Sequence, residues 1–345
     1  MNKFSIGVDL GGTNLRIAAV DEQGALMEKV TLGTRIALGC EYVINDMCDA
    51  IQRISGKYKN AAPLLGIGIG VPGIIDMQTG LVRESPNLPG WADYPAGTLI
   101  ERRLKTVVVL ENDANVAALG EKWLGAARDY SDMAILTLGT GVGGGLVLGG
   151  AIWRGTNGMA GEFGHATVEP DGQLCGCGNR GCLEQYASAT AVVRMAREAI
   201  ALTKNGASAL ARAANSDPEF SAKSIYDLTL QGDEDARRIF RCVGRSLGIV
   251  LATLVNSLNL PIYVIGGGVS NAWDAFSPAI FEELRRRSIV YAATAPHDPL
   301  AIHDGASAHV KAGPGPKTIV TRALLGSDAG LFGAARLPMI AEARR

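Results

Sequence analysis

Apolar residues in the first part of the chain occur in short runs separated by tight, glycine-containing turns. Residues 5–9, 15–20 and 26–32 have the length and apolar content of strands. Connections this short predict antiparallel pairing, because parallel strands need a longer crossover, usually through a helix. The chain therefore begins with a predicted antiparallel meander of three strands.

The pattern then alternates between helical and strand periodicity. Apolar residues at helical spacing predict a helix over residues 41–54, and continuous apolar runs predict buried strands over residues 64–70 and 107–111. A second helix is predicted over residues 114–124. Strands that alternate with helices are typical of the α/β class.

A second pass of the opening pattern follows. Strands are predicted over residues 134–138, 146–148 and 151–153, with a glycine-rich turn over residues 139–144 between the first two. This turn occupies the same place as Asp9-Leu-Gly-Gly-Thr13 in the first pass. The repetition predicts two similar lobes, each with a glycine-rich hairpin, that face each other across a cleft.

The composition is that of a globular protein with a large core. The chain has 345 residues, of which 47% are hydrophobic and 19% charged, so two domains are expected. The net charge of -1 and the pI of about 6.5 provide no basic surface for nucleic acid, so a DNA- or RNA-binding role is not expected. The first residues lack the long apolar segment of a secretion signal.

Residues 246–273 contain no charged residue, which raises the question of a membrane span. A spanning helix needs about 20 continuous apolar residues, and Asn259 and Pro261 interrupt this run. We predict instead a buried helix over residues 237–258, then a turn and a buried strand. The sequence therefore predicts a soluble, cytoplasmic protein with no membrane partner.

One histidine and three cysteines lie within eighteen positions: His165, Cys175, Cys177 and Cys182. Zinc takes four nitrogen and sulfur ligands in tetrahedral geometry, and a closed set of four is typical of a structural site. No open position remains for a bound water, so the predicted Zn²⁺ is structural. The alternative, three unrelated thiols, is disfavoured by the Cys-x-Cys spacing and the nearby glycines.

Two acids flank this cluster. Glu162 lies three residues before His165, so both can face one pocket, and Glu184 lies just beyond Cys182. A histidine that binds metal through one nitrogen keeps its other N–H for a second partner, such as a ligand oxygen. Glutamate and histidine alone are usually surface residues, but beside the cluster they predict a rigid pocket for a polar small molecule.

Residues 139–144 satisfy the G-x-G-x-x-G pattern of dinucleotide-binding folds, but their context does not fit. That fingerprint opens a helix, whereas residues 146–150 predict a strand and a turn. Glycines in a hairpin instead let backbone N–H groups approach phosphate oxygens. A lone glycine hairpin is more often only a turn, whereas two at matching positions indicate nucleotide phosphates.

Two aspartates each have two interpretations. Asp9 ends a buried strand at a glycine turn, where it either caps the turn or holds Mg²⁺ through water. Asp113 lies where a strand meets a helix, and there either Asn112 or Asp113 can be the N-cap. Asp113 can also be a general base that takes a proton from an attacking hydroxyl, and both roles can hold at once.

Four glycine- or cysteine-containing segments form a recognisable set. They are Val8-Asp-Leu-Gly-Gly-Thr-Asn14, Leu138-Gly-Thr-Gly-Val-Gly-Gly144, Val264-Ile-Gly-Gly-Gly-Val-Ser270, and Gly161-Glu-Phe-Gly-His165 with Cys175-Gly-Cys-Gly-Asn-Arg-Gly-Cys-Leu-Glu184. Together they resemble the two phosphate motifs, the adenosine motif and the zinc and sugar signature of the ROK family of sugar kinases and repressors. The resemblance covers nearly the whole chain. It implies an α/β, actin-like ATPase (ribonuclease H-like) fold with two lobes around a cleft.

Carried over by position, the resemblance implies Asp113 as the catalytic base. Sugar hydroxyls fall on Gly73, Asn87, Asn112, Asp113, Glu162, His165 and Glu184, and Zn²⁺ on His165, Cys175, Cys177 and Cys182. ATP falls on Asp9, Gly11, Gly12, Thr13, Asn14, Gly139, Thr140, Gly141, Gly267 and Gly268. The sugar assignment is chemically reasonable, because carboxylates and amides bind hydroxyls through directional hydrogen bonds.

The resemblance implies an ATP-dependent hexose kinase that uses Mg²⁺ and forms a homodimer or dimer of dimers. Glucose, phosphorylated at its 6-hydroxyl, is the first expectation, because the segments ending at Trp91 and Glu121 look most like those of the family's glucokinases. N-acetylmannosamine, N-acetylglucosamine, fructose and allose are alternatives. A non-catalytic, repressor-type sugar-binding protein is a further alternative, but the first strand begins within five residues of Met1, which leaves no room for a winged helix-turn-helix.

The expected domain boundary lies near residue 112. Residues 1–112 form the predicted N-terminal lobe, to which a C-terminal helix over residues 327–345 returns. Residues 113–326 form the predicted C-terminal lobe with the zinc site and the adenosine motif. Residues 206–224 and 297–317 fit no motif of the family, and we assign them no role.

Overall fold

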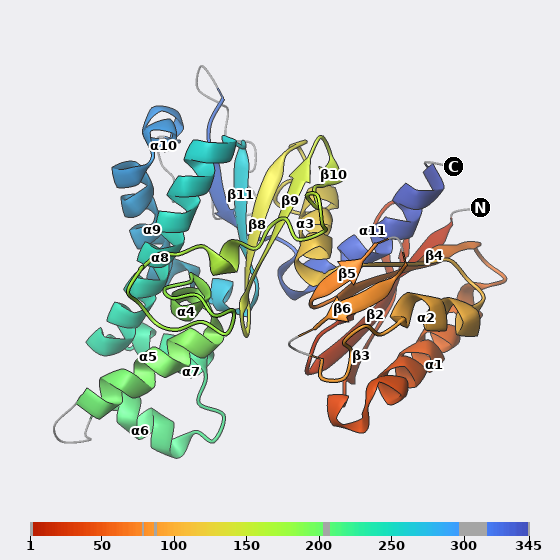
Figure 1. Ribbon diagram of the computed structural model, residues 1–345, viewed down its shortest axis with the longest axis horizontal. Helices are drawn as coiled ribbons and strands as arrows, with labels where there is room; N and C mark the ends of the chain where they lie inside the picture. Colours follow the sequence, from red (N-terminus) through yellow and green to blue (C-terminus); the bar gives the residue numbers. More distant parts are fainter. Residues whose placement is uncertain (1–2, 78, 86–87, 203–207, 297–315, 344–345) are drawn as a thin grey trace. The chain divides into compact units, whose positions relative to one another are not determined.

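The computed structural model describes residues 3–343, apart from residue 78 and residues 86–87, 203–207 and 297–315 (Figure 1). Its contacts divide the chain into two compact units. The first unit comprises Met1–Met133, Gly145–Gly161 and Ser327–Arg345, and the second comprises Ala134–Gly144 and Glu162–Gly326.

A five-stranded sheet forms the centre of the first unit. Its order is β3 (Leu26–Gly33), β2 (Asn14–Asp21), β1 (Phe4–Leu10), β4 (Leu64–Val71) and β7 (Val108–Asn112). The first three strands pair antiparallel, and β1, β4 and β7 pair parallel. The predicted meander and the two later strands are therefore confirmed, within a residue or two at their ends.

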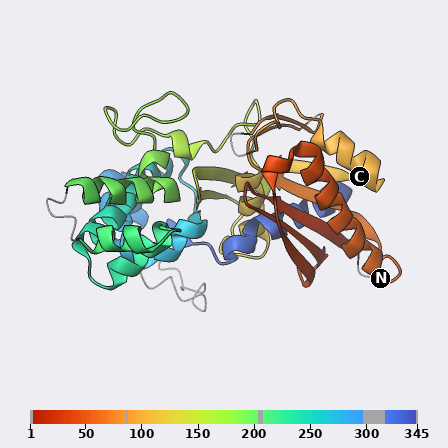
Figure 2. The same cartoon turned by 90° about the horizontal axis from the view of Figure 1, so that it is seen from below.

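The two faces of this sheet carry side chains of different size. Large residues of β1, such as Phe4 and Ile6, pack in one core with α1 (Cys40–Tyr58) and α2 (Ala96–Leu104). On the other face Gly7 and Gly68 meet α11 (Ala329–Ala343), where a Cβ on either glycine would lie within 2.2 Å of a helix carbonyl oxygen. Alternation of large and small residues thus brings α1 and α11 to opposite faces (Figure 2).

Small elements complete the first unit. They are η1 (Ile36–Leu38) and the hairpin β5 (Ile74–Asp76) and β6 (Leu81–Glu84). The 3-10 turn η5 (Gly326–Asp328) precedes α11 and begins at the last residue of the second unit. The helix predicted over residues 114–124 is α3 (Asp113–Trp123).

A second sheet repeats the strand order of the first. Its order is β10 (Ala151–Ile152), β9 (Val142–Leu148), β8 (Met133–Leu138), β11 (Ile262–Gly266) and β12 (Ile319–Arg322). In both sheets the strands run third, second, first, fourth and fifth along the chain, so the duplication predicted from the sequence is confirmed. The glycine turn between the first two strands is shorter than predicted, because β9 already begins at Val142 and includes Gly143 and Gly144.

Helices make up most of the second unit. They are η2 (Phe163–His165), α4 (Glu184–Ala187), α5 (Ala189–Leu202), α6 (Ala209–Ser216), α7 (Ala222–Leu230), α8 (Glu234–Leu258), η3 (Gly268–Ala272), α9 (Trp273–Arg287) and α10 (Ile289–Thr294). The helix predicted over residues 237–258 is α8. Among the described residues it is the one helix long and apolar enough to cross a membrane, but 61% of its apolar stretch is buried inside the protein. It packs on α9 through Gly244, where a Cβ would lie 2.0 Å from the Phe276 carbonyl oxygen.

The division into units differs from the boundary predicted near residue 112. Helix α3 belongs to the first unit, and so do residues 145–161. The reason is close packing between α3 and α11, since a Cβ on Gly333 would lie 1.7 Å from the Val116 carbonyl oxygen. A contact between segments so distant in the chain leaves no local signal in the sequence.

Candidate functional site

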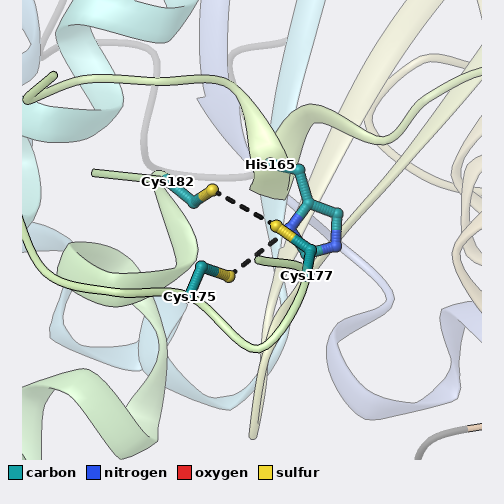
Figure 3. A group of neighbouring side chains, drawn as sticks. All are labelled: His165, Cys175, Cys177 and Cys182. Carbon is teal, nitrogen blue, oxygen red and sulfur yellow. Dashed lines mark hydrogen bonds between the residues drawn. The ribbon is translucent and has the colours of Figure 1, made fainter. Parts of the chain in front are cut away.

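The four predicted metal ligands come together in the second unit (Figure 3). Their ligand atoms all lie within 4.8 Å of one another. The Cys177 and Cys182 Sγ atoms are 3.7 Å apart, and Cys175 Sγ is 3.7 Å from His165 Nδ1. A tetrahedral zinc with Zn–S bonds of about 2.3 Å separates its sulfur ligands by about 3.8 Å, so the donor set and its spacing fit structural Zn²⁺.

Tight turns fold the cysteine segment into this arrangement. The Cys175 N–H donates to the Asn179 carbonyl at 2.8 Å, and the Gly178 N–H donates back to the Cys175 carbonyl at 3.0 Å. Gly178 has φ +89°, a left-handed conformation that favours glycine. The turn therefore presents Cys175 and Cys177 to one point, while Cys182 returns from the far side of the loop.

The thiols of Cys177 and Cys182 have different pKa values in the protein without metal. A backbone hydrogen bond from Asn179 lowers the pKa of Cys177, whereas burial raises the pKa of Cys182 to about 12. Bound zinc deprotonates its thiol ligands. Zinc binding at this site would therefore release protons.

The histidine ring connects the cluster to the first of the flanking acids. Its Nδ1 faces the thiols, and its Nε2 lies 3.9 Å from Glu162 Oε2. Both side chains are partly exposed, His165 at 38% and Glu162 at 53%. The structure thus brings Glu162 and His165 together as predicted, with the ring orientation that a metal at Nδ1 requires.

Glu184 lies between the cluster and the glycine hairpin at residues 139–141. Its Oε2 accepts a hydrogen bond from the Val142 N–H at 3.0 Å, and its Oε1 is 3.9 Å from Cys175 Sγ. A Cβ at Gly141 would lie 2.4 Å from Glu184 Oε2, so a larger residue there would displace this carboxylate. One carboxylate therefore links the metal cluster to the hairpin.

The second and third glycine motifs also lie together. The hairpin follows β8 and Gly267 follows β11, and these parallel strands end at the same edge of the sheet. Gly267 has φ +82°, and a Cβ there would lie 2.4 Å from the Leu138 carbonyl oxygen. The predicted phosphate and adenosine residues of the second unit are thus neighbours.

The first unit gathers its candidate residues at the carboxyl ends of β1, β4 and β7. Asn112 is the N-cap of α3: its side chain accepts from the N–H groups of Ala114 and Asn115. Its Nδ2 donates to the Gly73 carbonyl at 3.2 Å. Asp113 Oδ1 accepts from the Ala114 N–H at 2.9 Å. Of the two N-cap candidates, the structure assigns the role to Asn112.

Glu111 and Arg154 were missed by the sequence analysis. Glu111 has a 2% exposed side chain, and its Oε2 accepts from Arg154 Nε at 2.7 Å. Its Oε1 accepts from the Asn112 N–H and from Asn115 Nδ2, each at 3.0 Å. A charged residue at the end of a buried strand was the available signal, because a buried carboxylate needs a partner.

Asp9 lies close to Arg16 and near the carboxylates of Asp113 and Asp328. Burial raises its pKa from 3.8 to about 6, Arg16 opposes the shift, and the charges of Asp113 and Asp328 add to it. Arg16 Nη1 is 3.3 Å from Asp9 Oδ2. Carboxylates that repel one another in this way fit a divalent cation such as Mg²⁺.

One predicted sugar residue, Asn87, lies outside the described residues. Its described neighbour Ser85 is close to the Gly73 turn, because the Ser85 hydroxyl donates to the Pro72 carbonyl at 2.6 Å. Among the described residues, Ser85 therefore contacts the turn that carries Gly73.

Comparison with known proteins defines the class that the duplicated sheet and the cysteine cluster suggest. The structure of a ROK family glucokinase from Streptomyces griseus, in complex with glucose and AMPPNP, superposes with a TM-score of 0.75 at 34% identity, covering 97% of this chain and 98% of that one. The chain has the actin-like ATPase fold of the ROK sugar kinases.

The sequence comparisons give the family. The ROK family profile matches residues 5–339, so the chain belongs to the ROK family. A glucokinase from Halalkalibacterium halodurans is 37% identical over 334 residues, which cover 96% of this chain and 94% of that protein. A glucokinase from Thermotoga maritima is 41% identical over 286 residues, covering 83% and 87%.

Proposed function

We propose that this protein is an ATP-dependent glucose kinase, which transfers the γ-phosphoryl group of ATP to the 6-hydroxyl of glucose (EC 2.7.1.2) in the cytoplasm. The similarity to proteins named glucokinases at 37% and 41% identity supports the substrate, and the similarity to a glucokinase with glucose and AMPPNP bound supports the donor. A homodimer is the assembly we expect.

One observation carries the proposal: Asp9 and Asp113 lie at the same end of the first sheet. Asp9 pairs in register with Gly70, and a Cβ on Gly70 would lie 3.7 Å from the Asp113 Cα. Asp9 belongs to a phosphate hairpin, and Asp113 belongs to the turn that carries the sugar candidate Asn112. Phosphoryl transfer needs a cation-holding carboxylate and a hydroxyl-orienting carboxylate near the same phosphate. A sugar-binding protein without catalysis needs neither.

In this proposal the oxygen of the sugar 6-hydroxyl bonds to the γ-phosphorus of ATP, and the bond between that phosphorus and the ADP oxygen breaks. Asp113 accepts the proton that the hydroxyl loses. Asn112, Glu162, His165 and Glu184, with Gly73 and Asn87, bind the other hydroxyls of the sugar. Positioning and charge neutralisation account for most of the rate, and Mg²⁺ supplies part of that neutralisation when bound. Asp9 would hold Mg²⁺ through water.

The remaining assignments concern the nucleotide and the structural metal. We assign the phosphates to Gly11, Gly12, Thr13 and Asn14 and to Gly139, Thr140 and Gly141, and the adenosine to Gly267 and Gly268. Zn²⁺ on His165, Cys175, Cys177 and Cys182 would fix the ring of His165 without taking part in the transfer.

The test is an ATP-dependent assay of the pure protein over a panel of hexoses, with zinc content measured on the same sample. We expect glucose 6-phosphate, detected by coupled oxidation with a 6-phosphate-specific dehydrogenase, and about one zinc per chain. Higher kcat/KM for N-acetylmannosamine, N-acetylglucosamine, fructose or allose would replace glucose as the substrate. No phosphorylation of any hexose would overturn the enzyme assignment.

A further inference from the structure

Two threonines outside every predicted site contact the two glycine hairpins. Thr34 follows β3 and is 2% exposed, and its hydroxyl donates to the Gly11 carbonyl at 2.6 Å. Thr190 lies in the first turn of α5, and its hydroxyl donates to the Thr140 carbonyl at 2.8 Å. Different elements of the two units therefore make the same kind of contact to equivalent hairpins.

A backbone bond accompanies each hydroxyl. The Thr34 N–H donates to the Thr13 carbonyl at 2.9 Å, and the Ala189 N–H donates to the Gly139 carbonyl at 2.8 Å. In the second hairpin Glu184 adds a further contact through the Val142 N–H. In each hairpin, therefore, one carbonyl accepts a hydrogen bond from a threonine hydroxyl and a second accepts one from a backbone N–H.

Because the peptide group is planar, a hydrogen bond that fixes the direction of a carbonyl also fixes the direction of the following N–H. In a trans peptide the C=O and the N–H of the next residue point in opposite directions. Holding the carbonyls of Gly11, Gly139 and Thr140 therefore directs the N–H groups of the residues after them away from the threonine side. Aligned backbone N–H groups of this kind bind anions, including phosphates.

We propose that Thr34 and Thr190 are positioning residues that aim the N–H groups of the two hairpins at the phosphates of the nucleotide. The inference rests on the proposed function, because it assumes that the hairpins bind phosphate. Neither threonine touches the nucleotide. Each acts through a carbonyl, so loss of its hydroxyl weakens nucleotide binding and leaves sugar binding unchanged.

The test compares Thr190→Val, which keeps the shape and loses the hydroxyl, with Thr190→Ser, which keeps the hydroxyl. Thr253→Val is the matched control, because the Thr253 hydroxyl donates only within α8, to the Ile249 carbonyl. Affinities for ADP and for glucose are measured by calorimetry on the same samples. For Thr190→Val we expect about threefold to tenfold weaker ADP binding, the loss typical of one hydrogen bond, with glucose affinity unchanged. Thr190→Ser and Thr253→Val keep the ADP affinity of the wild type.

The buried Thr34 is tested in the same way with Thr34→Val and Thr34→Ser, after circular dichroism shows that each is folded. Rescue by serine is the readout that a packing role would not give, since serine lacks the methyl group and keeps the hydroxyl. Equal ADP affinity in Thr190→Val and Thr190→Ser would overturn the inference. A wild type that binds glucose but no nucleotide would instead overturn the proposed function, and the inference with it.

Discussion

Asp9 combines a position suited to function with a cost in stability. Its carboxylate is partly buried, is paired with Arg16, and is repelled by Asp113 and Asp328. The folded protein therefore holds the proton on Asp9 more tightly than the unfolded chain does. Such a group is typical of a site in which a ligand cation completes the charge balance.

Asp9→Asn should increase the stability of the ligand-free protein above pH 6. The pKa of Asp9 is raised from 3.8 to about 6 on folding, so the wild type loses stability as the pH rises through this window and Asp9 must ionise. The linkage gives at most about 3 kcal/mol, and the asparagine variant should lack this slope. Urea unfolding at pH 4, 5, 6 and 7.5 measures the difference. The same slope in both proteins would refute the assignment to Asp9.

The buried Glu111–Arg154 ion pair supports the turn that carries Asn112, because Glu111 also accepts a hydrogen bond from the Asn112 N–H. Arg154→Met should destabilise the protein by about 3–5 kcal/mol, because it leaves the Glu111 carboxylate buried and unpaired. Arg83→Met is the control: Arg83 pairs with Asp76 and Asp93 at the surface, and its loss should cost less than about 1 kcal/mol. Equal urea midpoints for the two variants would show that the buried pair contributes nothing special.

At the scale of elements, glycines set how closely helices and strands approach. Gly7 and Gly68 admit α11 to the sheet, and Gly333 admits α3 to α11. Through α3, this packing supports the residues at the helix N-terminus, Asn112 and Asp113. The candidate catalytic turn therefore depends on a helix from the far end of the chain.

Gly333→Ala should destabilise the first unit, because its Cβ would lie 1.7 Å from the backbone oxygen of Val116 and the helices would have to separate. Gly56→Ala in α1 is the matched control, since a Cβ there meets nothing within 4 Å. Because alanine has a higher helix propensity than glycine, Gly56→Ala should instead raise the free energy of unfolding slightly, by up to about 1 kcal/mol. Thermal unfolding of both variants checks this. A higher melting temperature for Gly333→Ala would contradict the packing seen here.

The His/Cys cluster and the glycine hairpin at residues 139–142 are also linked at this scale, because Glu184 contacts both. Cys177→Ala should lose zinc and increase hydrogen exchange in residues 139–142, because Glu184 then loses its fixed position beside Cys175. Cys242→Ala, outside the cluster, should keep both zinc and protection. Slow hydrogen exchange in α8 of the Cys177→Ala variant shows that the second unit remains folded. Unchanged exchange at the hairpin in a zinc-free, folded variant would show that the two are independent.

At the scale of the whole molecule, the duplicated strand order was predictable because it is encoded locally. Strand periodicity and short glycine turns recur in the same order, and the metal ligands lie within one short segment. The family followed from motifs that were also local. Sequence reasoning found the strand order and the grouping of the four metal-ligand candidates because these signals were confined to neighbouring positions.

The rest depended on contacts between distant segments. Nothing near Glu111 indicates Arg154, and nothing near Thr140 indicates that Thr190 will hold its carbonyl. The packing of α3 on α11 is also a contact between distant segments. It places α3 in the first unit, whereas the boundary predicted near residue 112 assigned this helix to the second lobe. The roles of Asp113 and of the other candidate site residues remain predictions.

The most direct test of the central claim is the comparison of wild type with Asp113→Asn in ATP-dependent phosphorylation of glucose, with glucose affinity measured alongside. As general base and orienting group, Asp113 should matter for the transfer and little for binding, so kcat should fall by about 100-fold or more while the Kd for glucose changes less than about threefold. Robust glucose phosphorylation by the wild type with this split is the predicted result. An unchanged kcat in Asp113→Asn would contradict the mechanism.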